Sequence, residues 1–153
     1  MYYGAKTNTD SIRTPQHILT WVRDTFGDYF DPCPFNPGFD KNKHTDGRTI
    51  EWKPVTYVNP PYSIGYQFLK KCYTEIAAQH SNVIVFLGKL DLLGRKAFNG
   101  GCDIVLFRNR IIFPPFDKPP RFLVVMLVFH PTSSNTVYFY EDLTGNEFNN
   151  NTQ

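Results

Sequence analysis

The part of the sequence that most constrains the fold is residues 55–63, where a short apolar run is followed by an asparagine, two prolines, a tyrosine and a serine. A proline has a fixed φ and no N–H, so two in succession fit neither a helix nor a central strand. We therefore expect a strand that ends in a stiff, extended loop. Such a loop holds the Asn59 amide and the Tyr62 ring in fixed directions. The Asn59 oxygen and a proline carbonyl are acceptors and the ring is flat, which suits a planar group with an exocyclic NH₂.

The chain has 153 residues, a length that fits one domain with its own core, and we expect a single domain over 1–153. The formal net charge is only +2, so any nucleic-acid surface must be a local patch rather than a field of the whole molecule. Three cysteines without paired spacing argue against a disulfide framework and for a reducing compartment. No apolar run approaches the roughly 20 residues that span a bilayer. These features predict a soluble, cytoplasmic protein without a membrane partner.

Both ends of the chain are polar, and a helix is predicted next to the first of them. Thr14 is a good N-cap, Pro15 suits the first helical position, and Gly27 is placed to end the helix. Between them, apolar residues recur on one helical face at Ile18, Leu19, Val22 and Phe26. We expect residues 1–12 to be a flexible arm and the Asn-rich residues 144–153 to be a disordered tail.

A second apolar-to-polar boundary comes at Tyr29-Phe30, which leads into Asp31 and a loop rich in proline. This pattern is typical of the first strand of a doubly wound sheet at its carboxyl edge, where such folds bind their ligands. A carboxylate at that position would pair with a cationic amino group. Only some 25 residues separate Pro34 from Asn59, which leaves little room for two further βα units, so the predicted sheet is a reduced one.

The remainder of the chain alternates between strand and helix patterns. A helix capped by Ser63 is predicted from apolar residues at helical spacing, and a continuous apolar run at 83–87 predicts a strand buried on both faces. A parallel pairing of this strand with residues 55–58 follows as the default topology. A short helix is predicted at 92–98, and further strands at 103–107, 122–129 and 136–140, the last alternating enough for an antiparallel edge.

The motif Asn59-Pro60-Pro61-Tyr62 after an apolar strand resembles the catalytic loop of the amino-group methyltransferases that use S-adenosylmethionine. The motifs around it narrow the resemblance. In order along the chain they are Thr14-Pro15, Phe30-Asp31-Pro32-Cys33, Asp46-Gly47 and Trp52. Together they resemble the small phage-type DNA N-6-adenine methyltransferase family, over a span from about Arg13 to His130. The fold that this implies is α/β, a reduced Rossmann-like methyltransferase fold whose sheet is mostly parallel with an antiparallel edge.

The resemblance also implies roles for residues. The catalytic residues would be Asn59, Pro60, Pro61 and Tyr62. The residues that bind S-adenosylmethionine would be Thr14, Pro15, Asp31, Pro32, Cys33 and Asn59, with the Asp31 carboxylate on the methionine amino group. The chain departs from familiar nucleotide sites, which have a glycine-rich turn where this one has proline. The acidic residue that grips the ribose stays open between Asp46 and Glu51. No residue pattern matches a metal site, so no metal is expected.

Four residues are candidates for contact with nucleic acid. Lys89 lies in a turn where the family carries a basic residue, and Arg110 with Phe113 resembles the family's Arg-x-x-Phe. Arg108 directly follows the predicted strand 103–107. Phe116 is expected to be exposed on the proline-rich loop 114–120, where it could flank a flipped base. The expected partner is DNA, with RNA also open. Because no separate recognition domain is expected, a partner subunit or a homodimer would help to recognise the target. A phage or viral protein would act in the host cytoplasm.

The expected chemistry is methyl transfer to the amino group of adenine. The lone pair of that nitrogen is delocalised into the ring, so the nitrogen is a poor nucleophile until its hydrogens are held. The Asn59 oxygen and the Pro60 carbonyl can accept those two hydrogens, while Tyr62 stacks on the base. Three alternatives remain: methylation of RNA adenine, methylation of a protein glutamine, and a decayed scaffold that binds nucleic acid or a partner without catalysis.

Overall fold

The computed structural model describes residues 12–35 and 44–148. Over these residues the chain forms two α-helices, α1 (Gln16–Phe26) and α2 (Gly65–Ala77). Five strands form one sheet: β1 (Val55–Val58), β2 (Val83–Lys89), β3 (Asp103–Leu106), β4 (Val124–Phe129) and β5 (Val137–Phe139). Short 3₁₀ turns lie at Gly47–Thr49, Tyr62–Ile64, Leu90–Gly94 and Tyr140–Asp142. Each predicted strand is present except the first, and the helix predicted at 92–98 is the 3₁₀ turn Leu90–Gly94.

The sheet is open and mixed, with its strands in the order β1-β2-β4-β3-β5. The pairs β1/β2 and β3/β5 are parallel, whereas β4 is antiparallel to both of its neighbours. The prediction of an antiparallel edge is therefore wrong, because the antiparallel strand lies inside the sheet and the edge strand β5 is parallel. Burial gives the reason. Five of the six β4 residues are buried and none of the three in β5 is, so the more apolar strand takes the inner position.

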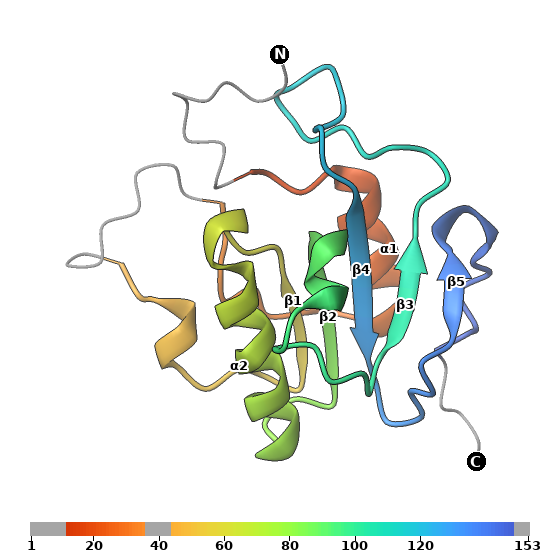
Figure 1. The fold of residues 1–153 in the computed structure, drawn as a ribbon. Helices are drawn as coiled ribbons and strands as arrows, with labels where there is room; N and C mark the ends of the chain where they lie inside the picture. Colours follow the sequence, from red (N-terminus) through yellow and green to blue (C-terminus); the bar gives the residue numbers. More distant parts are fainter. Residues whose placement is uncertain (1–11, 36–43, 149–153) are drawn as a thin grey trace.

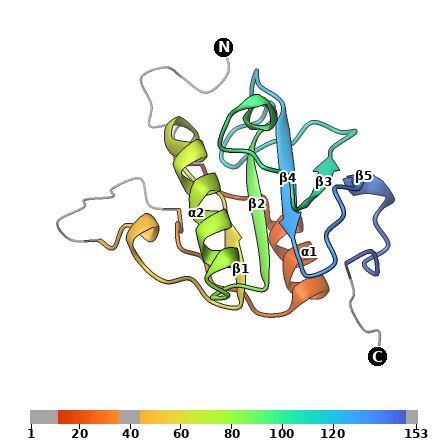
Figure 2. The same cartoon turned by 60° about the horizontal axis from the view of Figure 1, so that its bottom comes forward.

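The two helices cover opposite faces of the sheet (Figures 1 and 2). Successive residues of a strand point to opposite faces, and β2 follows this rule closely. Val85 and Leu87 pack in the core cluster that contains Ile18 and Val22 of α1. Their neighbours in β2 pack in a second cluster with α2, whose buried apolar residues are Phe68, Leu69 and Cys72. The molecule is thus a three-layer α/β/α structure with a core on each side of the sheet.

The first predicted strand, at Tyr29-Phe30, is reduced to a single bridge. Phe30 pairs in parallel with Thr56, on the side of β1 away from β2. α1 ends just before it at Gly27, whose φ of 88° favours glycine. At its other end α1 begins at Gln16 without a side-chain cap. The predicted N-cap, Thr14, instead turns its hydroxyl toward the end of β1, and Ser63 likewise lies within a 3₁₀ turn rather than capping α2.

Both predicted flexible ends contain ordered residues. Ile12, the last residue of the predicted arm, is 6% exposed, and Phe148, within the predicted tail, is 3% exposed. The Phe148 ring lies edge-on to Trp21 and to Tyr138, with centroid distances of 5.9 and 5.3 Å. The prediction of a disordered tail is therefore wrong over 144–148, because the Phe148 side chain packs in the core although the residues around it are polar. Residues 1–11 and 149–153 lie outside the described part of the chain.

Neither helix in the described part of the chain is long and apolar enough to cross a membrane.

Candidate functional site

The turn after Phe30 and the loop after β1 lie at the same end of the sheet. The Phe30 N–H donates to the Val55 carbonyl and the Tyr57 N–H donates to the Phe30 carbonyl, both at 2.9 Å. This pairing is parallel, so Asp31 and Asn59 each follow a strand at its carboxyl end. β2 is parallel to β1 and ends at Lys89 on the same edge. Open α/β sheets bind ligands at this edge, which makes it the candidate site.

Asn59 is held in one orientation by the segment that precedes α1. Its amide nitrogen donates to the carbonyl oxygen of Ile12 and to Thr14 Oγ1, both at 3.0 Å. Thr14 Oγ1 is also hydrogen-bonded to the Tyr57 hydroxyl at 2.7 Å. Tyr57 is completely buried, and this burial raises its pKa well above the ordinary value. The phenol therefore stays neutral at physiological pH, and the three side chains form one polar cluster at the end of β1.

The two prolines behave as the sequence predicts, because the loop is extended and then turns. Pro61 has φ −54° and ψ 133°, and its carbonyl accepts the Ile64 N–H at 3.1 Å, which closes the 3₁₀ turn Tyr62–Ile64. Since this turn uses the Pro61 carbonyl, the carbonyl of Pro60 is the one that we assign to a ligand. Pro60 itself is buried, so the position of the loop is fixed by packing as well as by its restricted φ.

Asp31 is a half-buried carboxylate at the mouth of the site. Its Oδ1 accepts the backbone N–H of Cys33 at 2.9 Å. Desolvation by burial raises the pKa of Asp31 from 3.8 to about 6, although this hydrogen bond opposes the shift. A cationic ligand would stabilise the ionised form of this carboxylate, because its positive charge compensates for the hydration that burial removes. The Cys33 thiol beside it is half-buried. This desolvation, together with the nearby Asp31 and Asp46 carboxylates, raises the pKa of the thiol to about 12. The thiol is therefore protonated and a poor nucleophile.

Gly47 packs closely against the turn that contains Asp31 and Pro32. A Cβ on Gly47 would lie 2.1 Å from the Pro32 carbonyl oxygen, so only glycine allows this approach. The Gly47 carbonyl in turn accepts the indole N–H of Trp52 at 2.8 Å. The backbone N–H of Trp52 donates to the buried Glu75 carboxylate at 2.6 Å. The sequence motifs Asp46-Gly47 and Trp52 thus act together as a support for the turn that carries Asp31.

The structure does not single out an acidic residue for a ribose. Both carboxylate oxygens of Asp46 accept hydrogen bonds from the Arg48 side chain, at 3.0 Å to Oδ1 and at 3.2 and 2.6 Å to Oδ2. Hydrogen bonding to Arg48 lowers the pKa of Asp46. Glu51 is exposed and lies 3.6 Å from His80. Among the described residues no group of three or more His, Cys, Asp and Glu side chains could hold a metal ion.

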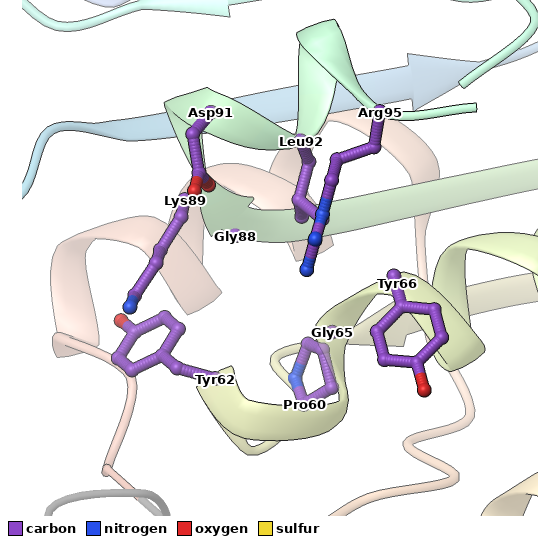
Figure 3. Close-up of a pocket in the computed structure, with 9 residues that line it drawn as sticks. All are labelled: Pro60, Tyr62, Gly65, Tyr66, Gly88, Lys89, Asp91, Leu92 and Arg95. Carbon is purple, nitrogen blue, oxygen red and sulfur yellow. The ribbon is translucent and has the colours of Figure 1, made fainter. Parts of the chain in front are cut away.

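A hollow opens between the Asn59 loop and the end of β2 (Figure 3). It encloses about 370 Å³ of space, a volume that includes open solvent. Its lining combines the aromatic rings of Tyr62 and Tyr66 with three charged residues and small or apolar residues: Lys89, Asp91, Arg95, Pro60, Gly65, Gly88 and Leu92. In Figure 3 the Lys89 side chain points toward Tyr62, and Arg95 reaches across toward Pro60. Aromatic rings and charged groups therefore line the same hollow.

Tyr62 is positioned by other aromatic rings. Its ring lies edge-on to Phe122 at a centroid distance of 4.7 Å and to Phe113 at 6.3 Å. The Lys89 ammonium lies 5.9 Å from the Tyr62 centroid and 4.7 Å from that of Phe122. This arrangement brings the predicted catalytic Tyr62 and the predicted nucleic-acid residue Lys89 into the same hollow.

The other three nucleic-acid candidates lie apart from the hollow and already have partners. Arg108 pairs with Asp142 at 2.8 Å and lies over the Phe139 ring at 3.9 Å. The Arg110 guanidinium donates to the carbonyls of Pro120 and, at 3.1 Å, of Phe122. Phe116 is half-buried against the core cluster of α1, so the expectation of an exposed ring is wrong. Arg110 thus holds the loop between β3 and β4 together.

Sequence reasoning missed Tyr66 and the groups that hold Asn59. Tyr66 lines the hollow, where its ring centroid lies 5.5 Å from the Arg95 guanidinium. Tyr66 lies two positions before Phe68, so it does not share the buried face of α2. An aromatic residue off the buried face is the one sequence signal that could have identified Tyr66 as a site residue. Ile12 and Tyr57 hold Asn59 and Thr14 through a backbone carbonyl and a buried hydroxyl, and neither group has a sequence signature.

No family model matches the chain, and comparisons with curated proteins and with solved structures likewise found no match.

Proposed function

We propose that the protein is an S-adenosylmethionine-dependent methyltransferase that acts on the exocyclic amino group of adenine in DNA, with a reduced Rossmann-like methyltransferase fold. The observation that carries this proposal is the adjacency of two loops. The Asp31 turn and the Asn59-Pro60-Pro61-Tyr62 loop follow neighbouring parallel strands at one edge of the sheet. A cation-binding carboxylate and a pair of rigid acceptors therefore lie side by side, as transfer between two bound ligands requires.

The Asp31 turn suits the methionine end of the cofactor. Asp31 is desolvated and its Oδ1 accepts a hydrogen bond from a backbone N–H, so an ammonium group would complete its surroundings. Pro32 and Cys33 would line the same end, with Thr14 and Pro15 on the other side of Asn59. When bound, S-adenosylmethionine supplies a methyl group on a sulfonium, which is a good leaving group. Because the Cys33 thiol is held protonated, it does not compete for that methyl.

The Asn59 loop suits the amino group that receives the methyl. The amide oxygen of Asn59 and the Pro60 carbonyl can accept its two hydrogens, which draws the lone pair out of the ring and toward the methyl group. These hydrogen bonds do not need to remove a proton before the nitrogen–methyl bond forms. Once that bond has formed, the positively charged amine loses a proton to water. The rigid loop keeps both acceptors in place, and placement alone can account for about 7 to 11 kcal/mol of barrier in well-oriented systems.

The hollow beside this loop suits the base. An adenine that leaves the stack can lie against Tyr62, and base-to-aromatic stacking of about 1 to 3 kcal/mol offsets part of the unstacking cost. Lys89 and Arg95 at the rim can contact the flanking phosphates. Arg108, Arg110 and Phe116 fit less well, since their side chains already hold the chain together. A second subunit or a homodimer would extend the DNA contact beyond this hollow.

The proposal is tested by incubating the protein with labelled S-adenosylmethionine and four acceptors: single-stranded DNA, duplex DNA, RNA of the same sequence, and a glutamine-containing peptide. We expect label in DNA, recovered as N6-methyladenine after digestion and mass spectrometry. If only the RNA or only the peptide is labelled, the substrate would be RNA adenine or protein glutamine instead of DNA. A folded protein that shows no heat of binding when titrated with the cofactor would contradict the enzyme and favour a decayed scaffold.

Replacing Asp31 by asparagine is expected to weaken cofactor binding about 10- to 100-fold, because a charge-assisted hydrogen bond is lost. The same change should stabilise the fold near neutral pH. The folded-state pKa of Asp31 is about 6 and its ordinary value 3.8, so the folded state binds more protons between these values and stability falls as pH rises through that window. D31N should gain roughly 1 to 3 kcal/mol over the wild type above about pH 7 and nothing below about pH 3.8.

Calorimetric titration measures the first effect of D31N, and urea unfolding at the two pH values measures the second. The exposed Asp24 of α1 provides a matched control, since D24N should change neither quantity. An unchanged cofactor affinity in D31N would remove Asp31 from the site.

A further inference from the structure

The amide of Asn59 has only one satisfied orientation. Its nitrogen carries two hydrogens, and these go to the Ile12 carbonyl and to Thr14 Oγ1, each at 3.0 Å. A flipped amide would set its oxygen against the Ile12 carbonyl, which has no hydrogen to give. The flipped state would lose a hydrogen bond and bring two partial negative charges together. The segment before α1 therefore fixes the amide with its nitrogen toward Ile12 and Thr14, which leaves the oxygen on the other side.

Thr14 is fixed in turn by a buried partner. Its Oγ1 lies 2.7 Å from the hydroxyl of Tyr57, a residue of β1 with no exposed surface. The Tyr57 ring lies edge-on to Tyr29 at 5.7 Å, next to Phe30. Tyr57 therefore connects Thr14 to the bridge that aligns the Asp31 turn with β1. Tyr57 of β1 thus contacts two other segments, the one before α1 through its hydroxyl and Tyr29 through its ring.

Thr14 makes no contribution to the start of the helix that follows it. A threonine before a proline at a helix start would normally be assigned a capping role, but α1 has Pro15 at its N-cap and no side-chain cap. The first turn is closed by the Pro15 carbonyl, which accepts the N–H groups of Ile18 at 3.1 Å and Leu19 at 3.3 Å. The Thr14 hydroxyl is thus used for Asn59 and Tyr57, and its removal should leave α1 intact.

We propose that Ile12 and Thr14 form a positioning element that locks the Asn59 amide with its oxygen toward the substrate, and that Thr14 is a positioning residue for methyl transfer. This inference rests on the proposed function. It also explains why this chain needs asparagine at position 59. The lock requires a hydrogen-bond donor there, which an ionised aspartate would lack.

The test compares Thr14→Val, which keeps the shape and removes the hydroxyl, with Thr14→Ser, which keeps it. Thr20→Val is the matched control, because Thr20 lies exposed on α1. Single-turnover methyl transfer and cofactor affinity are measured for each. We expect T14V to slow transfer about 10- to 100-fold, since a small misplacement of a reacting group has effects of this size. Cofactor affinity should fall much less than the rate, because the Thr14 hydroxyl is used by Asn59 and Tyr57. T14S and T20V should transfer at nearly the wild-type rate.

A second measurement monitors the lock itself, without activity. In a ¹⁵N-edited NMR spectrum, both side-chain amide protons of Asn59 should exchange slowly in the wild type, and T14V should release one of them. Transfer at the wild-type rate in T14V, or an Asn59 amide that T14V leaves unchanged, would overturn the inference. So would a loss of cofactor affinity that accounts for the whole loss of rate. A wild-type protein that transfers no methyl would instead overturn the proposed function, and the inference with it.

Discussion

Replacing Asn59 by alanine is expected to slow methyl transfer about 100- to 1000-fold, the usual loss when one preorganised hydrogen-bonding group is removed from a transition state. The Asn59 oxygen is proposed to accept a hydrogen from the adenine amino group, and alanine offers no acceptor. Asp31 and its turn are untouched, so the affinity for S-adenosylmethionine should survive. Single-turnover transfer to DNA and calorimetric titration with the cofactor measure the two quantities separately. This split distinguishes a lost catalytic contact from a lost binding site.

The control for Asn59→Ala is Asn82→Ala. Asn82 is exposed and lies just before β2, at the end of the sheet away from the site. Its replacement should leave both transfer and binding unchanged. Far-UV circular dichroism checks that the Asn59 variant is folded, since it also loses hydrogen bonds to Ile12 and Thr14. A folded N59A protein that transfers methyl at the wild-type rate would contradict the proposed mechanism.

Replacing Asp103 by alanine is expected to cost about 3 to 5 kcal/mol of unfolding free energy, because several donors lose their acceptor and each unsatisfied buried donor costs about 1 to 3 kcal/mol. Asp103 and His130 are almost fully buried, and Asp103 Oδ2 lies 2.5 Å from His130 Nε2. Asp103 Oδ1 accepts the backbone N–H groups of Ser134 at 3.2 Å and Thr136 at 2.9 Å. Alanine would leave these donors and the imidazole without an acceptor. A loss of this size is a large share of the roughly 5 to 15 kcal/mol that stabilises a domain.

Urea unfolding measures the effect of D103A, and D24A on the exposed face of α1 is its control. Asp103 starts β3 and His130 follows β4, so the pair lies at the end of the sheet opposite Asn59. Methyl transfer by folded D103A, well below its unfolding transition, should therefore equal that of the wild type. A variant with wild-type stability would mean that the pair contributes no net stabilisation.

The sequence predicted those parts of the fold that depend on local pattern. The apolar run that became β2 and the proline loop after β1 each carry their own signal, and Gly27 ends α1 where its position indicates. The place of β4 in the sheet had no such signal, because its neighbours are chosen by burial against distant strands. Phe148 was missed for the same reason. Its contacts, to Trp21 among others, are made across most of the length of the chain.

The candidate site divides in the same way. Asp31 and Asn59 were predicted because each is a polar residue directly after an apolar strand pattern, and the parallel pairing of Phe30 with Thr56 brings them to one edge. The partner of Asn59 at Ile12 is a backbone carbonyl, which every residue carries, so no residue type could mark it. Phe116 failed because a proline-rich loop was expected to be exposed. The neighbouring Phe113 is fully buried and fixes that loop to the core.

The position of β4 between β2 and β3 affects where the sequence can change in evolution without loss of the fold. Because β4 is antiparallel to β3, the connection of residues 107–123 leaves and re-enters the sheet at one end, the end at which β2 stops at Lys89. Figure 1 shows this connection running from the end of β3 to the start of β4. Buried side chains such as Ile111 and Phe113 fasten it, while Ile112 between them is 46% exposed. Substitutions or insertions at its outward positions would alter the surface offered to a target without disturbing either core. New specificity could thus evolve in this one connection on an unchanged scaffold.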